Sequence, residues 1–198
     1  MAVGVQGSKK DRGAVTETER QLLDAIRGGD PQALRRLYDR YSRYAMAVGL
    51  RYIHDRSDMD DVLQDSFVSI LGSIDRFQYK GEGSLKAWVS RIVTNRAVDW
   101  LKEHRRIKFV GDIPDEIDEE KEIIPEIDAV PPEILNRMIR QLPVGCRTVL
   151  NLYVFEQIPH KDIARRLNIK EKTSHSQYAH ARRLLEKMIR EYISSQRI

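Results

Sequence analysis

Residues 159–185, PHKDIARRLNIKEKTSHSQYAHARRLL, predict two helices joined by a tight turn. Pro159 suits the first turn of a helix, and the apolar residues that follow recur at helical spacing. After a turn at Asn168, a second helix is expected from about Glu171 to Ile193. This spacing is typical of a helix-turn-helix, whose second helix lies in the major groove of DNA. The stretch therefore predicts an all-α, DNA-binding unit.

The second of these helices has two different faces. Residues Ser174, Tyr178, Ala181 and Leu185 fall on one stripe at 100° per residue and are expected to pack inward. The remaining face carries hydrogen-bonding and cationic groups that suit bases and phosphates. The proposed DNA-contacting residues are Lys172, Thr173, His175, Ser176, Gln177, Ala179, His180 and Arg183. A solvated basic face is the alternative reading of the same pattern.

The charge of the chain is unevenly distributed. Of the 198 residues, 34 are basic and 30 acidic, yet the stretch between Gly111 and Glu133 has ten acids against one lysine. Four prolines also interrupt it, which favours a linker at 109–130 over a folded domain. Residues 1–15 are expected to form a flexible tail, with helical domains at 16–108 and 131–198. The acidic linker reads as a solubilising spacer or as a segment that occupies a basic nucleic-acid channel.

The N-terminal domain is predicted to be a helical bundle. Thr16 and Glu19 form a capping-box pattern before its first helix, which is expected to end at Gly28 and Gly29. A helix that begins near Ser57 exposes a stripe made of Asp61, Gln64, Asp65 and Val68. Solubility explains the acids, whereas docking on a basic partner helix also explains the exposed valine.

A glycine-containing loop precedes the longest helix of this domain. The loop FQYKGEG spans residues 77–83, and Ser84 is expected to cap the helix that follows. Trp88 and Asn95 lie along one edge, and the helix ends in a basic cluster that suits phosphate contact. The candidate nucleic-acid residues of this region are Lys80, Gly81, Gly83, Trp88, Arg91, Asn95, Lys102, Arg105 and Arg106.

Several other classes of protein fit the sequence poorly. The chain has no apolar run near the ~20 residues of a membrane span, and its first residues lack the apolar core of a signal peptide. We therefore expect a cytoplasmic protein. Cys146, the only cysteine, is expected to be a packing residue. No metal, cofactor or small-molecule substrate is predicted, and hydrolysis by Asp58, Asp60, Asp61 and His54 is a remote alternative.

Three motifs in order resemble the extracytoplasmic-function (ECF) sigma factors, which give bacterial RNA polymerase its promoter specificity. The motifs are DDVLQDSF at 60–67, FQYKGEGSLKAWVSRIVTNRAVDWLKEHRR at 77–106, and LPVGCRTVLNLYVFEQIPHKDIARRLNIKEKTSHSQYAHARRLL at 142–185. The resemblance implies two helical domains, sigma region 2 and sigma region 4, joined by the acidic linker. It also implies a role without catalysis of its own.

The resemblance assigns roles to these motifs. The stripe at Asp61, Gln64 and Asp65 matches the surface that docks on the clamp helices of the largest polymerase subunit, and the flap is a further polymerase contact. The loop and Asn95 match the part that opens the minus-10 element and captures a flipped base. The helix at 171–192 matches the reader of the minus-35 element, and the linker matches a segment in the polymerase exit channel.

The partners implied are core RNA polymerase, promoter DNA and, as in many family members, an anti-sigma factor. The free protein is expected to be a monomer. Lys172 and Ser174 depart from the residues common in the family, and His175 and Gln177 stand where arginines are frequent. Base preference at minus-35 therefore cannot be transferred from other members. A stand-alone helix-turn-helix regulator is the principal alternative.

Overall fold

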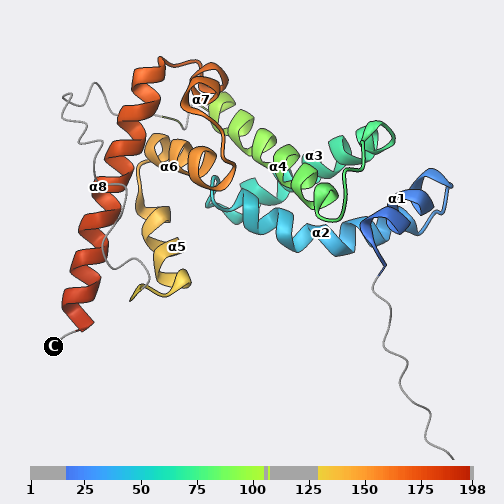
Figure 1. Cartoon of the computed structure of the whole chain (residues 1–198), viewed down its shortest axis with the longest axis horizontal. Coiled ribbons are helices and arrows are strands. Elements are labelled where there is room, and N and C mark those ends of the chain that lie inside the picture. The colour runs from blue at the N-terminus through green and yellow to red at the C-terminus, as the bar shows by residue number, and fades with distance from the viewer. Residues whose placement is uncertain (1–16, 105–106, 108–128, 197–198) are drawn as a thin grey trace, which may run out of the picture.

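The computed structural model describes residues 17–104, 107 and 129–196, and these residues form an all-α protein (Figure 1). Within these ranges there are eight α-helices and no strand, which confirms the predicted fold class. The helices form two lobes, α1 to α4 and α5 to α8. The predicted tail at 1–15 and nearly all of the predicted linker at 109–130 lie outside the described residues.

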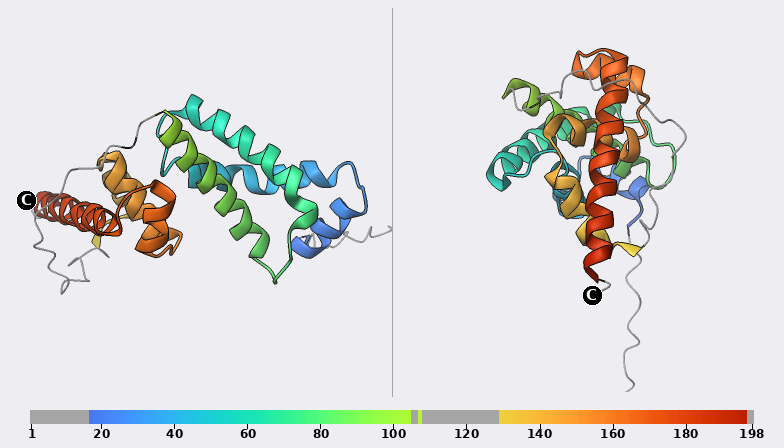
Figure 2. Two further views of the ribbon diagram at one scale, coloured as in Figure 1. Left: turned by 90° about the horizontal axis from the view of Figure 1, so that it is seen from above. Right: turned by 90° about the vertical axis from the view of Figure 1, so that its left-hand side faces the viewer.

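The N-terminal lobe packs three long helices around one core, with a short helix at one end (Figure 2). Helices α2, α3 and α4 contact one another in every pairing, and α1 packs against α2. The 3-10 turn η1 continues α3 and leads into the loop at 77–83. The bounds are α1 (Glu19–Arg27), α2 (Ala33–Gly49), α3 (Arg56–Ser73), η1 (Ile74–Arg76) and α4 (Ser84–Glu103).

The C-terminal lobe is organised around its longest helix, which contacts each of the three other α-helices. The bounds are α5 (Pro132–Gln141), α6 (Val144–Leu150), the π-helical turn η3 (Asn151–Phe155), α7 (His160–Leu167) and α8 (Glu171–Gln196). Asn168 adopts φ 55° at the end of α7, a left-handed conformation that asparagine tolerates. The predicted helix, turn and helix are therefore present. Cys146 is fully buried in this lobe, as expected.

The two lobes share part of their hydrophobic core. Val149 and Leu152 are buried together with residues of the N-terminal lobe. Arg147 donates to the backbone oxygen of Tyr52 at 3.0 Å, and Asn151 donates to that of Arg51 at 2.9 Å. Burial, followed by the charge of Arg140, lowers the pKa of Arg147 to about 10. Backbone oxygens in place of a carboxylate thus accept from both terminal nitrogens of a buried guanidinium at the junction of the lobes, while its Nε has no hydrogen-bond partner among the described residues.

Two local predictions were wrong in detail. The capping box of α1 is formed by Thr18 and Gln21, not by Thr16 and Glu19, and Thr16 lies outside the described residues. Ser84 does not cap α4 either, because it is the first helical residue and its hydroxyl donates to the backbone oxygen of Gly81. Glu19 instead turns into the lobe, where it is 2% exposed. The sequence shows capping residues but not which helix they reach.

Replacing Arg147 with alanine is expected to lower the free energy of unfolding by about 3 kcal/mol, because three backbone oxygens lose a charged donor in a buried site. Urea unfolding followed by circular dichroism measures this loss. The control is Arg137→Ala, which truncates an exposed arginine of α5. Equal midpoints for the two variants would show that the buried arginine does not hold the lobes together.

Candidate nucleic-acid and polymerase interface

The start of α4 is capped by a carboxylate from a distant part of the chain. Glu19 accepts hydrogen bonds from the backbone N–H groups of Leu85 at 2.9 Å and Lys86 at 3.0 Å. The hydroxyl of Tyr41 donates to the same carboxylate at 2.8 Å. Burial acts to raise the pKa of Glu19, but these hydrogen bonds outweigh it and hold the pKa below its ordinary value of 4.5. Glu19 is therefore an ionised, buried cap that sits where the helix dipole favours a negative charge.

A second acid makes the reciprocal contact. The carboxylate of Glu82, in the loop, accepts from the backbone N–H of Glu19 at 3.2 Å. Arg40 of α2 and the hydroxyl of Tyr79 donate to it at 3.3 Å. Glu19 of α1 thus binds N–H groups in the first turn of α4, and Glu82, in the loop before α4, binds the first N–H group of α1. Helix α1 and the loop at 77–83 are thereby tied together.

Glycines and ring contacts shape the loop itself. Gly81 and Gly83 have φ of 121° and 89°, in the left-handed region that favours glycine. At the start of the loop, Phe77 packs on Trp88 with ring centroids 4.9 Å apart. Trp88 is half-buried, and Lys80 is exposed at the tip. The candidate residues of the loop are thus held between η1 and the first turns of α4.

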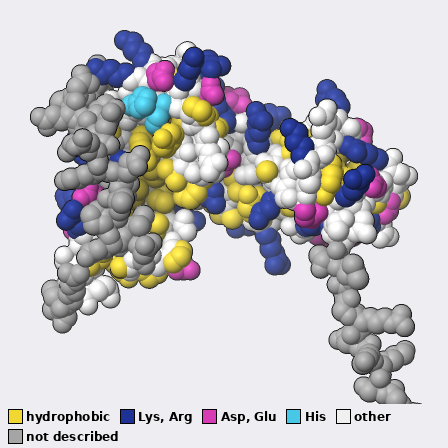
Figure 3. Space-filling model, viewed as in Figure 1, with side chains coloured by type: hydrophobic (Ala, Val, Ile, Leu, Met, Phe, Trp, Pro, Cys, Tyr) yellow, Lys and Arg dark blue, Asp and Glu magenta, His cyan; other side chains and the backbone are white. Residues whose placement is uncertain are grey.

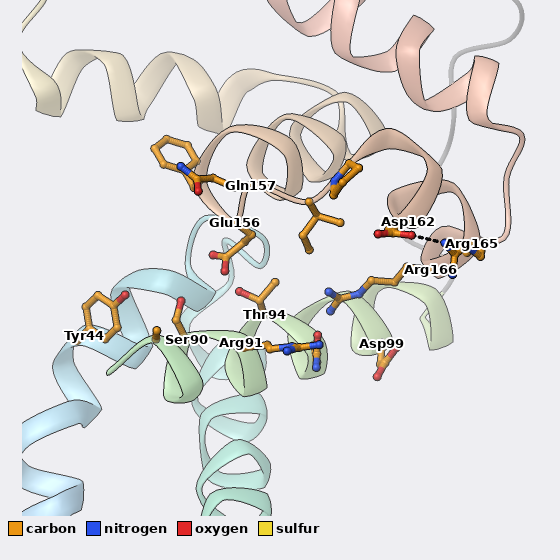
Figure 4. Close-up of a pocket in the computed structure, with 15 residues that line it drawn as sticks. Tyr44, Ser90, Arg91, Thr94, Asp99, Glu156, Gln157, Asp162, Arg165 and Arg166 are labelled. Carbon is orange, nitrogen blue, oxygen red and sulfur yellow. Dashed lines mark hydrogen bonds and ion pairs between the residues drawn. The ribbon is translucent and has the colours of Figure 1, made fainter. Parts of the chain in front are cut away.

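The edge of α4 that carries Asn95 lines a cleft of about 1030 Å³ between the lobes (Figure 4). Figure 4 shows Arg91 and Thr94 on one side and Glu156 and Arg166 on the other. Lys102 faces the same lobe, since its Nζ donates to the backbone oxygen of Arg166 at 3.2 Å. The candidate residues Arg105 and Arg106 lie outside the described residues. A strand that reaches Asn95 therefore approaches it at the junction of the lobes.

The predicted docking stripe is exposed on α3. Asp61, Gln64 and Asp65 all face solvent, and Val68 is 66% exposed. Leu71, one turn further along the helix, and Tyr38 of α2 are also exposed. The structure thus places an acidic stripe beside large apolar side chains that a free monomer does not need on its surface.

The candidate minus-35 residues do not share one face of α8. Lys172, His175 and Arg183 are exposed, and Thr173, Ala179 and His180 are partly exposed. Gln177 was expected to reach base edges, but it is fully buried, and its side-chain oxygen accepts from the thiol of Cys146 at 3.1 Å. Ser176 is buried as well, with its hydroxyl bonded to the backbone oxygen of Lys172. In this structure those two side chains pack within the lobe and do not face outward.

A cluster of rings joins α7 to α8, and no pattern in the sequence had predicted it. His160 stacks on Tyr153 at 4.3 Å and lies 4.0 Å from His175, measured between ring centroids. Its Nδ1 is 2.8 Å from the hydroxyl of Ser174. Burial, followed by the neighbouring His175, lowers the pKa of His160 to about 4, so the ring is neutral near pH 7. Figure 3 shows histidines beside an apolar surface on this lobe.

The described residues also bear on the metal, membrane and hydrolase alternatives. Among the described residues, no group of three or more His, Cys, Asp or Glu side chains could hold a metal ion. No helix in the described ranges is both long and apolar enough to cross a membrane. His54 stands near Arg147 and Arg140, and burial together with these charges lowers its pKa to about 4. The arrangement gives no support to the hydrolase alternative.

Comparison with known proteins identifies both lobes. The model of sigma-70 region 2 matches residues 37–107, and that of sigma-70 region 4 matches residues 133–185. The chain belongs to the sigma-70 family. It is an ECF sigma factor, a promoter-recognising subunit of RNA polymerase. Sigma factors of this group bind core polymerase and promoter DNA and are initiation subunits without catalysis of their own.

Relatives resemble this sigma factor along nearly their whole length. It is 28% identical to the ECF RNA polymerase sigma-E factor of Haemophilus influenzae, over 87% of this chain and 95% of the relative. It is also 28% identical to the RNA polymerase sigma-H factor of Pseudomonas aeruginosa, over 87% and 94%. A solved structure of CnrH in complex with the cytosolic domain of CnrY aligns with 21% identity and a TM-score of 0.45, over 87% and 97%.

The cap formed by Glu19 makes the stability of the sigma factor depend on pH. Because its pKa is lower in the folded protein, its contribution is present above the unfolded pKa and is lost as pH falls through the folded pKa. We expect the free energy of unfolding of the wild type to fall more steeply between about pH 5 and pH 3 than that of Glu19→Gln. Urea unfolding at several pH values measures the two slopes. Parallel curves of the free energy of unfolding against pH for wild type and Glu19→Gln would contradict an ionised cap. The control is Glu17→Gln, two residues before the cap.

Proposed function

We propose that this sigma factor uses α3 to dock on core polymerase, the loop and α4 to open the minus-10 element, and α8 to hold the minus-35 element. The observation that carries the proposal is the exposed stripe at Asp61, Gln64, Asp65 and Val68. DNA phosphates repel such a surface, and a stand-alone helix-turn-helix regulator has no use for it. A basic protein helix, as in the clamp helices of the largest polymerase subunit, has the complementary charge.

The minus-10 role of the loop and α4 is supported by their chemistry. A base that leaves the duplex needs hydrogen-bond partners for its exposed edge, and the amide of Asn95 offers both a donor and an acceptor. The cleft beside Asn95 has room for a strand, and Arg91 supplies a cation at its wall. The exposure of Lys80 at the loop tip supports a contact between its ammonium group and a phosphate.

The minus-35 role of α8 is supported by its exposed residues. Lys172 and Arg183 suit phosphates, and His175 suits a base edge. We rank Ser176 and Gln177 below the exposed residues as DNA contacts, because base contact by either one requires its side chain to leave a buried position. The contact between the tilted rings of His175 and His160 ties the start of the recognition helix to α7.

The finer features of the assembly follow from the same proposal. We infer a contact with the polymerase flap, passage of the acidic linker through the exit channel, and an anti-sigma factor as a regulatory partner. The free sigma factor is proposed to be a monomer and to work in the cytoplasm. A gel-shift experiment separates this function from that of a stand-alone regulator, since a regulator binds its operator tightly without core polymerase.

Replacing Asp61 and Asp65 with lysine is expected to weaken association with core polymerase more than about thirtyfold, because two attractive charges become repulsive at the contact. Both side chains are exposed, so the fold is expected to remain intact. Fluorescence titration of labelled sigma factor with core polymerase measures the affinity. The matched control reverses Glu133 and Glu191, two exposed acids of the other lobe. Retained affinity in the α3 variant would refute the docking stripe.

Asn95→Ala is expected to reduce open-complex formation about tenfold while initial promoter binding stays within about twofold, since a flipped base loses its polar partner only after melting. Permanganate reactivity of unpaired thymines reports opening, and filter binding reports the closed complex. Asn136→Ala, an exposed asparagine of α5, serves as the control. Equal losses in both assays would contradict a role in base capture.

A further inference from the structure

The contacts that α1 makes beyond α2 converge on the minus-10 loop. Arg27 donates to the backbone oxygen of Phe77 at 2.6 Å, and the guanidinium of Arg20 lies 5.9 Å from the centre of the Tyr79 ring. Glu19 holds the first turn of α4 directly after the loop. Helix α1 therefore touches the start, the middle and the end of the segment at 77–86. The family roles given above assign nothing to this helix.

The loop depends on these contacts because its own residues provide few alternatives. The N-cap position of α4 is Gly83, which has no side chain to accept a hydrogen bond, and the first turn contains no acid. The N–H groups of Leu85 and Lys86 must be satisfied by an acceptor from elsewhere. Glu19 is 2% exposed, so water does not readily take its place. Without this carboxylate, two glycines with positive φ would join η1 to an uncapped helix.

A loop that is ordered in advance binds a strand more tightly than one that orders on binding, because its conformational entropy is lost during folding. We propose that α1 is the positioning element of the minus-10 loop. It acts through Arg27 at the start of the loop and through Glu19 at the end of the loop. Neither side chain contacts DNA in this mechanism. The inference rests on the proposed role of the loop and adds what holds it in its binding conformation.

Holoenzyme assembled from purified core polymerase and full-length sigma factor tests the inference. The probe is a fluorescent single-stranded oligonucleotide that carries the minus-10 element of a promoter mapped by run-off transcription with the same holoenzyme. Glu19→Gln keeps the shape of the side chain but points an amide donor at N–H donors, so affinity for the probe is expected to fall about tenfold. Glu17→Gln, two residues away and paired with Arg36, is expected to stay within about twofold of wild type.

A second variant tests the loop without disturbing the core. Arg27 is exposed, so Arg27→Met removes its bond to Phe77 and leaves the buried residues in place. We expect a threefold to fivefold loss of affinity for the probe, which lies in the net range of one typical hydrogen bond at an exposed site. Arg35→Met, an exposed arginine of α2 that pairs with Asp39, is the matched control. If Glu19→Gln does not fold, the result for Arg27→Met decides the question.

Three further measurements separate positioning from general instability. Affinity for core polymerase and for a minus-35 duplex should stay unchanged in both variants, whereas a loss of folded protein lowers all three affinities in proportion. Hydrogen exchange of the Leu85 and Lys86 amides should speed up in Glu19→Gln. The inference is overturned if both variants bind the probe like wild type, or if all affinities fall together. Asn95→Ala completes the design, because an unchanged affinity for that variant would count against the proposed function itself.

Discussion

The ionised carboxylate of Glu19, buried at the start of α4, sets the geometry of the N-terminal lobe. A helix begins with N–H groups that have no partner within the helix, and the N-cap residue of α4 is Gly83, which has no side chain to accept from them. Glu19 reaches this site from α1, across more than sixty residues of chain. The site therefore joins three helices, α1, α2 and α4, since Tyr41 of α2 donates to the same carboxylate.

The same site explains why the loop before α4 can contain two glycines and still hold one shape. Glycine lets the chain adopt positive φ but leaves many other conformations open. Glu82 restricts them from within the loop by binding α1, Tyr79 and Arg40. The glycines thus permit the turn, and the hydrogen bonds of Glu82 select one of its possible conformations.

Local patterns in the sequence predicted the helices well and their distant partners poorly. The rhythm of α3 predicted the exposed stripe at Asp61 to Val68, and the turn at Asn168 predicted the helix-turn-helix. The predicted cap of α4 was wrong because a serine at the start of a helix is a common N-cap residue. The actual cap is Glu19, which comes from a distant part of the chain. Gln177 was predicted to face DNA but is buried. It lies at the border of two faces of α8, where periodicity alone does not decide burial. The domain boundaries and the roles of the site residues stay predictions.

The junction between the lobes has a consequence for how the protein can change over generations. Arg147 and Asn151 bind the main-chain oxygens of residues 52 and 51, and every amino acid supplies such an oxygen. These hydrogen bonds therefore constrain the identity of the donors and leave that of the acceptors unconstrained. We expect selection on these hydrogen bonds to act on Arg147 and Asn151 of the C-terminal lobe, whereas replacement of Arg51 or Tyr52 leaves the acceptor oxygens in place.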